Sequence, residues 1–147
     1  MNTNNSYQKA TEMTELMYGL FQKCRSREER HAQKFGVCVA EFRCLRTLNS
    51  GDGLVAKKLA AKLGLTSSRL TRIIDGMVHK DLIVRKTINS DRRTIQILLS
   101  KKGKNLAQHI NNDYVEVHSQ ILDKIEKSER TILLSALKSL LSAMENV

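Results

Sequence analysis

The sequence predicts a mainly α-helical protein that contains one small β-hairpin. Apolar residues recur at three- and four-residue spacing through most of the 147 residues, which is typical of amphipathic helices. There is no proline and there are only seven glycines, so few residues interrupt helix formation. Two short β-like runs, 82–88 and 94–99, are separated by the polar residues 89–93, which predicts a hairpin.

The first third of the chain predicts two helices. Apolar residues spaced along one face indicate a helix over about 7–30. A connection over 31–38 contains Gly36, and a second helix follows with its apolar face at Val39, Phe42, Leu45 and Leu48. The turn-forming residues 49–53 end this helix.

The middle of the chain predicts two more helices before the hairpin. The third covers 54–63, and Gly64 ends it. Thr66 or Ser67 can cap a fourth helix, because a hydroxyl oxygen at this position accepts a hydrogen bond from a free backbone N–H. The expected buried face of the fourth helix consists of Leu70, Ile73, Ile74, Met77 and Val78.

Two long helices complete the prediction after the hairpin. Ser100 can cap a helix that starts at Lys101 and extends to about residue 127, and Ser128 starts the last one. The apolar stripes over 13–24 and 121–144 exceed what a small core can cover, and this indicates association with a second copy of the chain.

Positive charge is concentrated in the centre of the chain. The net charge is +10, and residues 50–104 alone hold 13 Lys and Arg against 4 Asp and Glu. Such a block is the expected electrostatic signature of a phosphate-binding surface. An anionic membrane surface could use the same block, but the motifs inside it, described next, favour double-stranded DNA as the partner.

The segment 55–74 has the spacing of a helix-turn-helix. Ala60 lies where two helices cross, Gly64 allows the tight turn, and Leu70 fixes the second helix. An ordinary helical hairpin would share this pattern, but the outward residues of the second helix are short hydrogen-bonding groups and arginines, which suit base edges and phosphates. The candidate DNA-binding residues here are Thr66, Ser67, Ser68, Arg69, Thr71 and Arg72.

The hairpin adds a candidate wing to this motif. Arg92 and Arg93 stand at its expected tip, where an arginine can enter the narrow minor groove. Asp91 beside them can orient a guanidinium by hydrogen bonding. The fold class is thus a winged helix-turn-helix core flanked by N- and C-terminal dimerisation helices.

These residues resemble the DNA-binding core of the MarR family of bacterial transcription regulators. The resemblance is carried by Leu59-Ala60, Leu63-Gly64, residues 71–75 (TRIID), Asp91-Arg92-Arg93, and residues 97–103 (ILLSKKG). It implies a single domain over 1–147, with dimerisation helices at 1–38 and 101–147 and a DNA-binding lobe at 39–100. It also implies a homodimer, usually a repressor, that binds a pseudo-palindromic operator and is released by an effector such as a small molecule.

Two alternatives stay open at this point. The chain could be a winged-helix protein-interaction module without specific DNA binding, since a fold does not fix a function. It could also be a thiol-based redox regulator of the same family. Cys38 lies at the expected start of the second helix, where the helix dipole favours a thiolate, and Cys24 lies among basic residues. The competing interpretation makes Cys24 and Cys44 small core residues.

Other classes of function have little support in the sequence. The motifs G-x-S-x-G, G-x-x-x-x-G-K-[ST] and H-E-x-x-H do not occur, so we expect no enzyme and no catalytic residue. The sequence contains no C-x-x-C pair and no two histidines at a metal-binding spacing, so we expect no metal and no cofactor. The polar N-terminus and the absence of an 18-residue apolar run predict a cytoplasmic protein without a membrane partner.

Overall fold

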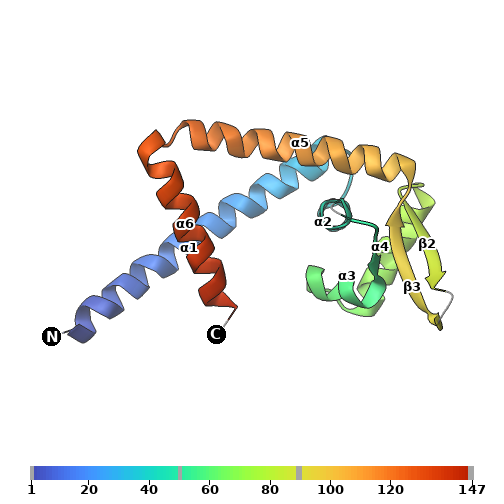
Figure 1. Ribbon diagram of the computed structural model, residues 1–147, viewed down its shortest axis with the longest axis horizontal. Helices are drawn as coiled ribbons and strands as arrows, with labels where there is room; N and C mark the ends of the chain where they lie inside the picture. The colour runs from blue at the N-terminus through green and yellow to red at the C-terminus, as the bar shows by residue number, and fades with distance from the viewer. Residues whose placement is uncertain (1, 50, 89–90, 146–147) are drawn as a thin grey trace. The chain divides into compact units, whose positions relative to one another are not determined.

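The computed structural model describes residues 2–49, 51–88 and 91–145. The described part is mainly helical with one small antiparallel sheet, which confirms the predicted fold class. The elements run in the order α1 (Asn2–Lys34), α2 (Val39–Leu48), β1 (Leu54–Val55), α3 (Ala56–Leu63), α4 (Ser67–His79), β2 (Ile83–Ile88), β3 (Asp91–Leu99), α5 (Lys101–Asp123) and α6 (Lys127–Met144) (Figure 1).

The chain divides into two compact units, Met1–Ile110 and Asn111–Val147. The first unit holds a continuous apolar core in which α2, α3, α4 and the sheet meet. Its most deeply buried side chains are Phe42, Leu45, Leu59, Ile74, Met77, Ile97 and Ile110. The second unit contains the end of α5 and all of α6, and no described residue of α6 is buried.

The helix-turn-helix follows from local signals at the α3–α4 junction. Gly64 ends α3 with a φ of 62°, a left-handed conformation that glycine adopts without steric cost. Leu65 N donates to Ala60 O at 2.9 Å, which satisfies a free carbonyl at the helix end. Thr66 then caps α4, because its Oγ1 accepts from Arg69 N at 3.3 Å. The predicted turn and cap are both confirmed.

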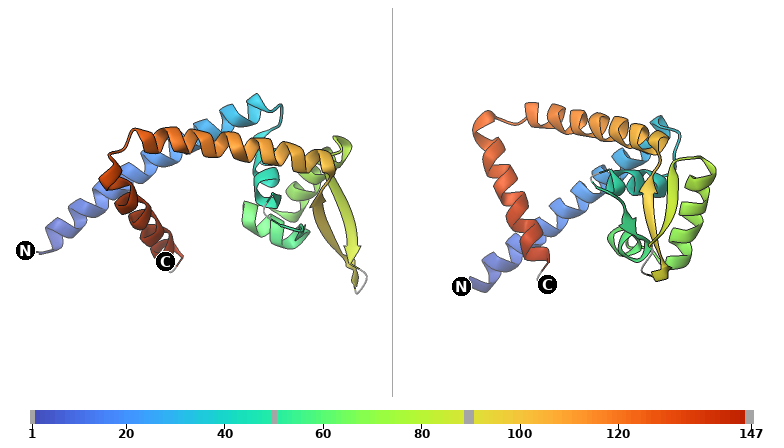
Figure 2. Two further views of the ribbon diagram at one scale, coloured as in Figure 1. Left: turned by 45° about the horizontal axis from the view of Figure 1, so that its top comes forward. Right: turned by 45° about the vertical axis from the view of Figure 1, so that its right-hand side comes forward.

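The sheet contains a strand that the local pattern did not predict. Residues 54–55 were expected to begin the third helix, but they form β1, where Leu54 pairs with Ile97 of β3. The strand order is β1-β3-β2, and both pairs are antiparallel. Figure 2 shows the β2–β3 hairpin lying beside α4.

Two helix predictions and one prediction about a cysteine also needed correction. The first helix runs from Asn2 to Lys34, so it is longer at both ends than expected and includes the first half of the expected connection 31–38. Val78 is exposed, because the buried stripe of α4 is narrower than expected and follows Leu70, Ile74 and Met77. Cys24 is exposed within this chain, so it is not a core residue of the described unit.

The base of the hairpin is joined tightly to the start of α5. Ser100 Oγ accepts from Gly103 N at 2.9 Å, which confirms the predicted cap, and it also donates to Asp81 O at 2.6 Å. Gly103 lies so close to Leu82 that a Cβ built on it would be 2.0 Å from Leu82 O. This junction fixes where α4 ends relative to the sheet.

Candidate nucleic-acid interface

The N-terminal half of α4 presents a polar surface to solvent. Its buried stripe turns the remaining positions outward, and the exposed residues are Ser67, Ser68, Arg69, Thr71 and Arg72. Thr71 Oγ1 donates to Ser67 O at 2.9 Å, and this bond stays within the helix. Within the described part of the chain, neither Arg69 nor Arg72 forms an ion pair. Both guanidinium groups are therefore available to an external anion.

The hairpin carries an irregularity near its tip. Thr87 pairs with Ile95 but Ile88 pairs with Asp91, so the register shifts between these two positions. Residues 92–94 are extra residues on β3 at this point, and bulges of this kind redirect side chains. Arg93 lies in this segment and is exposed. The predicted tip thus becomes the first part of β3, while residues 89–90 and the side chains of Asp91 and Arg92 lie outside the described residues.

A concave surface brings α4 and the hairpin together. A hollow of about 660 Å³ is lined by Ser67 and Thr71 from α4 and by Arg93 from β3. Its floor includes the apolar side chains of Leu70, Ile74 and Ile97, which belong to the core or its edge. Three of the predicted site residues therefore share one surface. Ser68, Arg69 and Arg72 are exposed on α4 outside this lining, and so is the N-cap residue Thr66.

Two residues of this surface were not predicted from the sequence. Lys57 of α3 and Arg85 of β2 both line the hollow. Arg85 Nη2 forms an ion pair with Asp75 Oδ1, which links the recognition-helix candidate α4 to the hairpin. An outward lysine in the first turn of α3 is visible in the sequence, but only the fold brings it into one lining with Thr71.

The C-terminal end of α4 is held by a largely buried carboxylate. Glu41 of α2 accepts from Lys80 Nζ at 2.8 and 2.9 Å, and its side chain is only 7% exposed. The same carboxylate accepts from Cys38 N at 3.0 Å, at the start of α2. Glu41 thus connects the first turn of α2 to the end of α4, and it orients the polar surface of α4 without being part of it.

The three cysteines differ in exposure. Cys24 lies on α1 and Cys38 is the N-cap residue of α2, and both are exposed. Cys44 is buried, and burial raises its pKa to about 12, with further contributions from the negative charges of Cys38 and Glu41. The Cys44 thiol is therefore protonated at neutral pH. Neither exposed cysteine lines the hollow beside α4.

No group of three or more His, Cys, Asp or Glu side chains that could hold a metal gathers in residues 2–49, 51–88 and 91–145. None of the helices in the described part of the chain is long and apolar enough to span a bilayer.

Comparison with known proteins finds a similarity to one family of regulators. The model of the MarR family matches residues 39–95, which include α2, the helix-turn-helix and most of the hairpin. The uncharacterized HTH-type transcriptional regulator YpoP of Bacillus subtilis is 28% identical over 100 residues, which cover 68% of this chain and 71% of YpoP.

Solved structures show the same fold. A MarR family protein from Bacillus stearothermophilus superposes with a TM-score of 0.86 at 18% identity, covering 95% of this chain and 97% of that one. MepR of Staphylococcus aureus, solved in complex with DNA, gives a TM-score of 0.74 at 19% identity and covers 90% and 97% of the two chains. Over residues 39–95, which hold the helix-turn-helix and most of the hairpin described above, this chain is thus similar to the MarR family.

Proposed function

We propose that this chain is a sequence-specific, double-stranded DNA-binding regulator of transcription. The observation that carries the proposal is the surface on which Ser67 and Thr71 of α4 and Arg93 of the hairpin line one hollow, with the arginines of α4 exposed beside it. The N-terminal part of a recognition helix is the part that meets base edges in the major groove. The resemblance of the fold to MepR, which has been solved with DNA, supports this assignment.

The proposed roles divide between the two elements. Arg69 and Arg72 can each donate two hydrogen bonds to the edge of a guanine. The hydroxyl groups of residues 66–68 and 71 can donate to bases or phosphates. Arg92 and Arg93 would enter the minor groove, and Asp91 would orient one of them. The lobe that holds these residues is 39–100, flanked by dimerisation helices at 1–38 and 101–147.

We further propose that the chain acts as a homodimer and as a repressor released by an effector. Large apolar side chains are exposed on α1 and on α6, and they would need a covering surface in water. Those of α1 are Tyr7, Met13, Leu16, Tyr18, Leu20 and Phe21, and those of α6 are Ile132, Leu134, Leu137, Leu141 and Met144. A two-fold dimer matches a pseudo-palindromic operator, because each half-site meets one α4.

The test compares two arginines on different elements. A binding site is first selected from random duplexes, and the parent, Arg72→Ala and Arg93→Ala proteins are then titrated on that site and on a scrambled duplex. Loss of a base contact by Arg72→Ala should cost about 1–3 kcal/mol on the selected site and less on the scrambled one. Arg93→Ala should weaken binding to both duplexes. It should change the major-groove consensus little, since the minor groove mainly distinguishes A·T from G·C.

Lys138→Ala provides the matched control, because Lys138 is an exposed cation on α6 in the other compact unit. It should bind both duplexes like the parent. If the parent selects no sequence and its binding does not depend on salt, the chain is better described as a protein-interaction module. If it selects a site but both arginine variants bind like the parent, α4 and the hairpin are not the reading surface.

A further inference from the structure

The hairpin leaves the sheet as an arm of two strands. β1 covers only Leu54–Val55, and these residues pair with Ile97 and Gln96 of β3. Between Gln96 and the tip, the described residues of β3 pair with β2 alone. Among the residues of β2, only Ile83 at its start is buried. A two-stranded arm has little stability of its own, so its direction depends on the few contacts that it makes with neighbouring elements.

An ion pair joins this arm to α4 at the point where the arm leaves the sheet. Arg85 of β2 lies opposite Ile97, in the part of the sheet that still contains three strands. Its Nη2 binds Asp75 Oδ1 in the second half of α4. Both side chains line the hollow that is also lined by Thr71 and Arg93. The ion pair therefore connects the helix to the arm beside the proposed base and minor-groove contacts.

The carboxylate of Asp75 is unfavourable on a surface that meets phosphates. Asp75 is exposed on the outward side of α4, one turn after Thr71 and three residues after Arg72. An isolated carboxylate at this position repels the DNA backbone and lowers affinity. Pairing with Arg85 neutralises the carboxylate and also holds two elements together, which an uncharged residue in its place would not do.

The exposure of the pair indicates that it contributes more to geometry than to stability. The side chains of Arg85 and Asp75 are 37% and 58% exposed, and ion pairs of this kind add little to the free energy of unfolding. A small energy is nevertheless enough to bias the direction of an arm that packing holds at one end. The register shift between Thr87 and Ile88 lies farther along β2, so the position of the tip depends on the direction that the arm takes at Arg85.

We propose that Arg85 and Asp75 are positioning residues that fix the hairpin relative to α4, and so set the distance along the duplex between their contacts. This inference rests on the proposed function, in which α4 meets base edges and the hairpin enters the minor groove. Neighbouring base pairs lie about 3.4 Å apart, so a small displacement of the arm changes which step Arg93 meets. The ion pair thus determines how far from the α4 site a narrow, A·T-rich minor groove is preferred.

The experiment uses duplexes in which an A·T-rich segment is moved in steps of one base pair relative to the selected α4 site. The parent should bind best at one offset. Asp75→Asn and Arg85→Gln should each lower the ratio of affinities between this offset and its neighbours by roughly 5-fold. The charge-reversed variant Asp75→Arg/Arg85→Asp rebuilds the ion pair and should restore most of the ratio. A merely structural role would weaken binding at all offsets alike.

The overall affinities of the two single variants separate positioning from direct contact with DNA. Asp75→Asn removes a negative charge and releases Arg85. It should therefore bind the scrambled duplex more tightly than the parent, with a salt slope that is steeper by about 1 per protomer. Arg85→Gln leaves the carboxylate without its partner and should bind every duplex more weakly. If Arg85 only contacted DNA, Asp75→Asn would keep the parent's preference for one offset.

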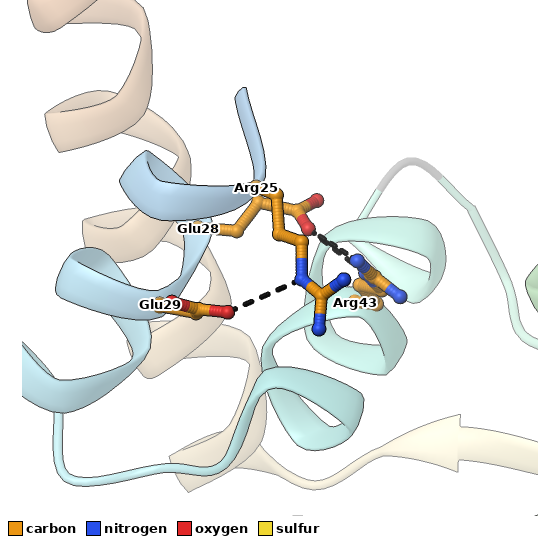
Figure 3. Close-up of polar contacts among 4 residues, drawn as sticks. All are labelled: Arg25, Glu28, Glu29 and Arg43. Atoms are coloured by element: carbon orange, nitrogen blue, oxygen red, sulfur yellow. Dashed lines mark hydrogen bonds and ion pairs between the residues drawn. The ribbon is translucent and has the colours of Figure 1, made fainter. Parts of the chain in front are cut away.

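Glu28→Gln is the matched control, because it breaks another ion pair between two elements. Glu28 Oε2 of α1 accepts from Nη2 and Nε of Arg43 of α2 at 2.6 and 2.9 Å, as Figure 3 shows. This variant changes the charge by the same amount as Asp75→Asn, but neither α4 nor the hairpin takes part in the contact. Its affinity should depend on the offset in the same way as that of the parent.

Denaturation checks the fold of each variant. Because the pair is partly exposed, both single variants should unfold at nearly the same denaturant concentration as the parent. A folded Asp75→Asn protein with the parent's preference for one offset overturns the inference and leaves the proposed function intact. A double variant no closer to the parent than the single variants also overturns it. A parent without any preference among the offsets refutes the minor-groove role of the hairpin together with the inference, and a parent that binds no duplex refutes the proposed function itself.

Discussion

Replacing Gly103 with alanine should destabilise the protein, although glycine-to-alanine changes in helices usually stabilise. Gly103 lies in the first turn of α5, where alanine would normally gain about 1 kcal/mol from helix propensity. Here the new Cβ would lie 2.0 Å from Leu82 O and 2.9 Å from Leu82 C. Both contacts are shorter than the 3.0 Å below which a neighbour must move.

The neighbouring backbone has little freedom to move away. Leu82 is buried, its N–H donates to Met77 O at 2.9 Å, and its carbonyl accepts from Ser100 N at 3.0 Å. Separation of α5 from Leu82 would weaken this second bond and the Ser100 cap on Gly103, each worth about 1 kcal/mol. Overpacking itself costs about 1–3 kcal/mol. After the gain in helix propensity, the free energy of unfolding should fall by about 2–4 kcal/mol.

Chemical denaturation at a fixed protein concentration measures this change, and Gly76→Ala is the matched control. Gly76 lies within α4, and its nearest neighbour for a new Cβ is Glu41 Oε1 at 3.9 Å, an ordinary contact. That variant should be stabilised by about 0.4–1 kcal/mol. A Gly103→Ala protein as stable as the parent would refute the close approach of α5 to Leu82 on which the reasoning depends.

Three further outcomes are expected. Lys80→Met should lower the free energy of unfolding by about 1–3 kcal/mol, because it leaves the Glu41 carboxylate buried without its ammonium partner. Adding Glu41→Gln to the same chain should restore part of the loss, and destabilisations that simply add in the double variant would contradict the pairing. A thiol reagent should modify Cys38 in the native protein but reach Cys44 only in denaturant. The Cys44 pKa is raised from 9.0 to about 12, so the contribution of the buried thiol to the free energy of unfolding should be intact below pH 9 and lost as the pH rises toward 12. A Cys44→Ala protein whose stability falls at alkaline pH in the same way as that of the parent would contradict this. Leu141→Asp should shift the proposed dimer toward monomer in sedimentation while Ser139→Asp does not, and equal behaviour of the two would exclude Leu141 from the proposed interface.

Local signals were sufficient to predict most of the helices. The second helix begins at Val39 and ends at Leu48 as expected, because an apolar stripe and a turn-rich segment define it without reference to the rest of the chain. The cap at Thr66 and the stop at Gly64 depend equally on nearby backbone groups. Strand β1 could not be predicted in this way. Leu54 and Val55 become a strand only because β3 returns beside them, and that pairing joins distant parts of the sequence.

The same distinction applies to the candidate interface. The outward residues of α4 could be predicted by removing the apolar stripe from a helix of known start. Lys57 and Arg85 could not, since one depends on the angle between α3 and α4 and the other on the register of the hairpin against α4.

The supports of α4 and its candidate contacts lie at opposite ends of the helix. Glu41 holds Lys80, Ser100 holds the carbonyl of Asp81, and Lys102 Nζ donates to the carbonyl of Lys80 at 3.1 Å, so the C-terminal end is fixed from two sides. The N-terminal end, which carries Arg69 and Arg72, is exposed. A helix fixed at one end presents the other at a defined angle to the hairpin while its long side chains stay free to adapt to a ligand. Such preorganisation reduces the cost of ordering the surface on binding. Loss of the Glu41–Lys80 contact should therefore change the orientation of all α4 contacts together, whereas loss of one arginine removes only its own.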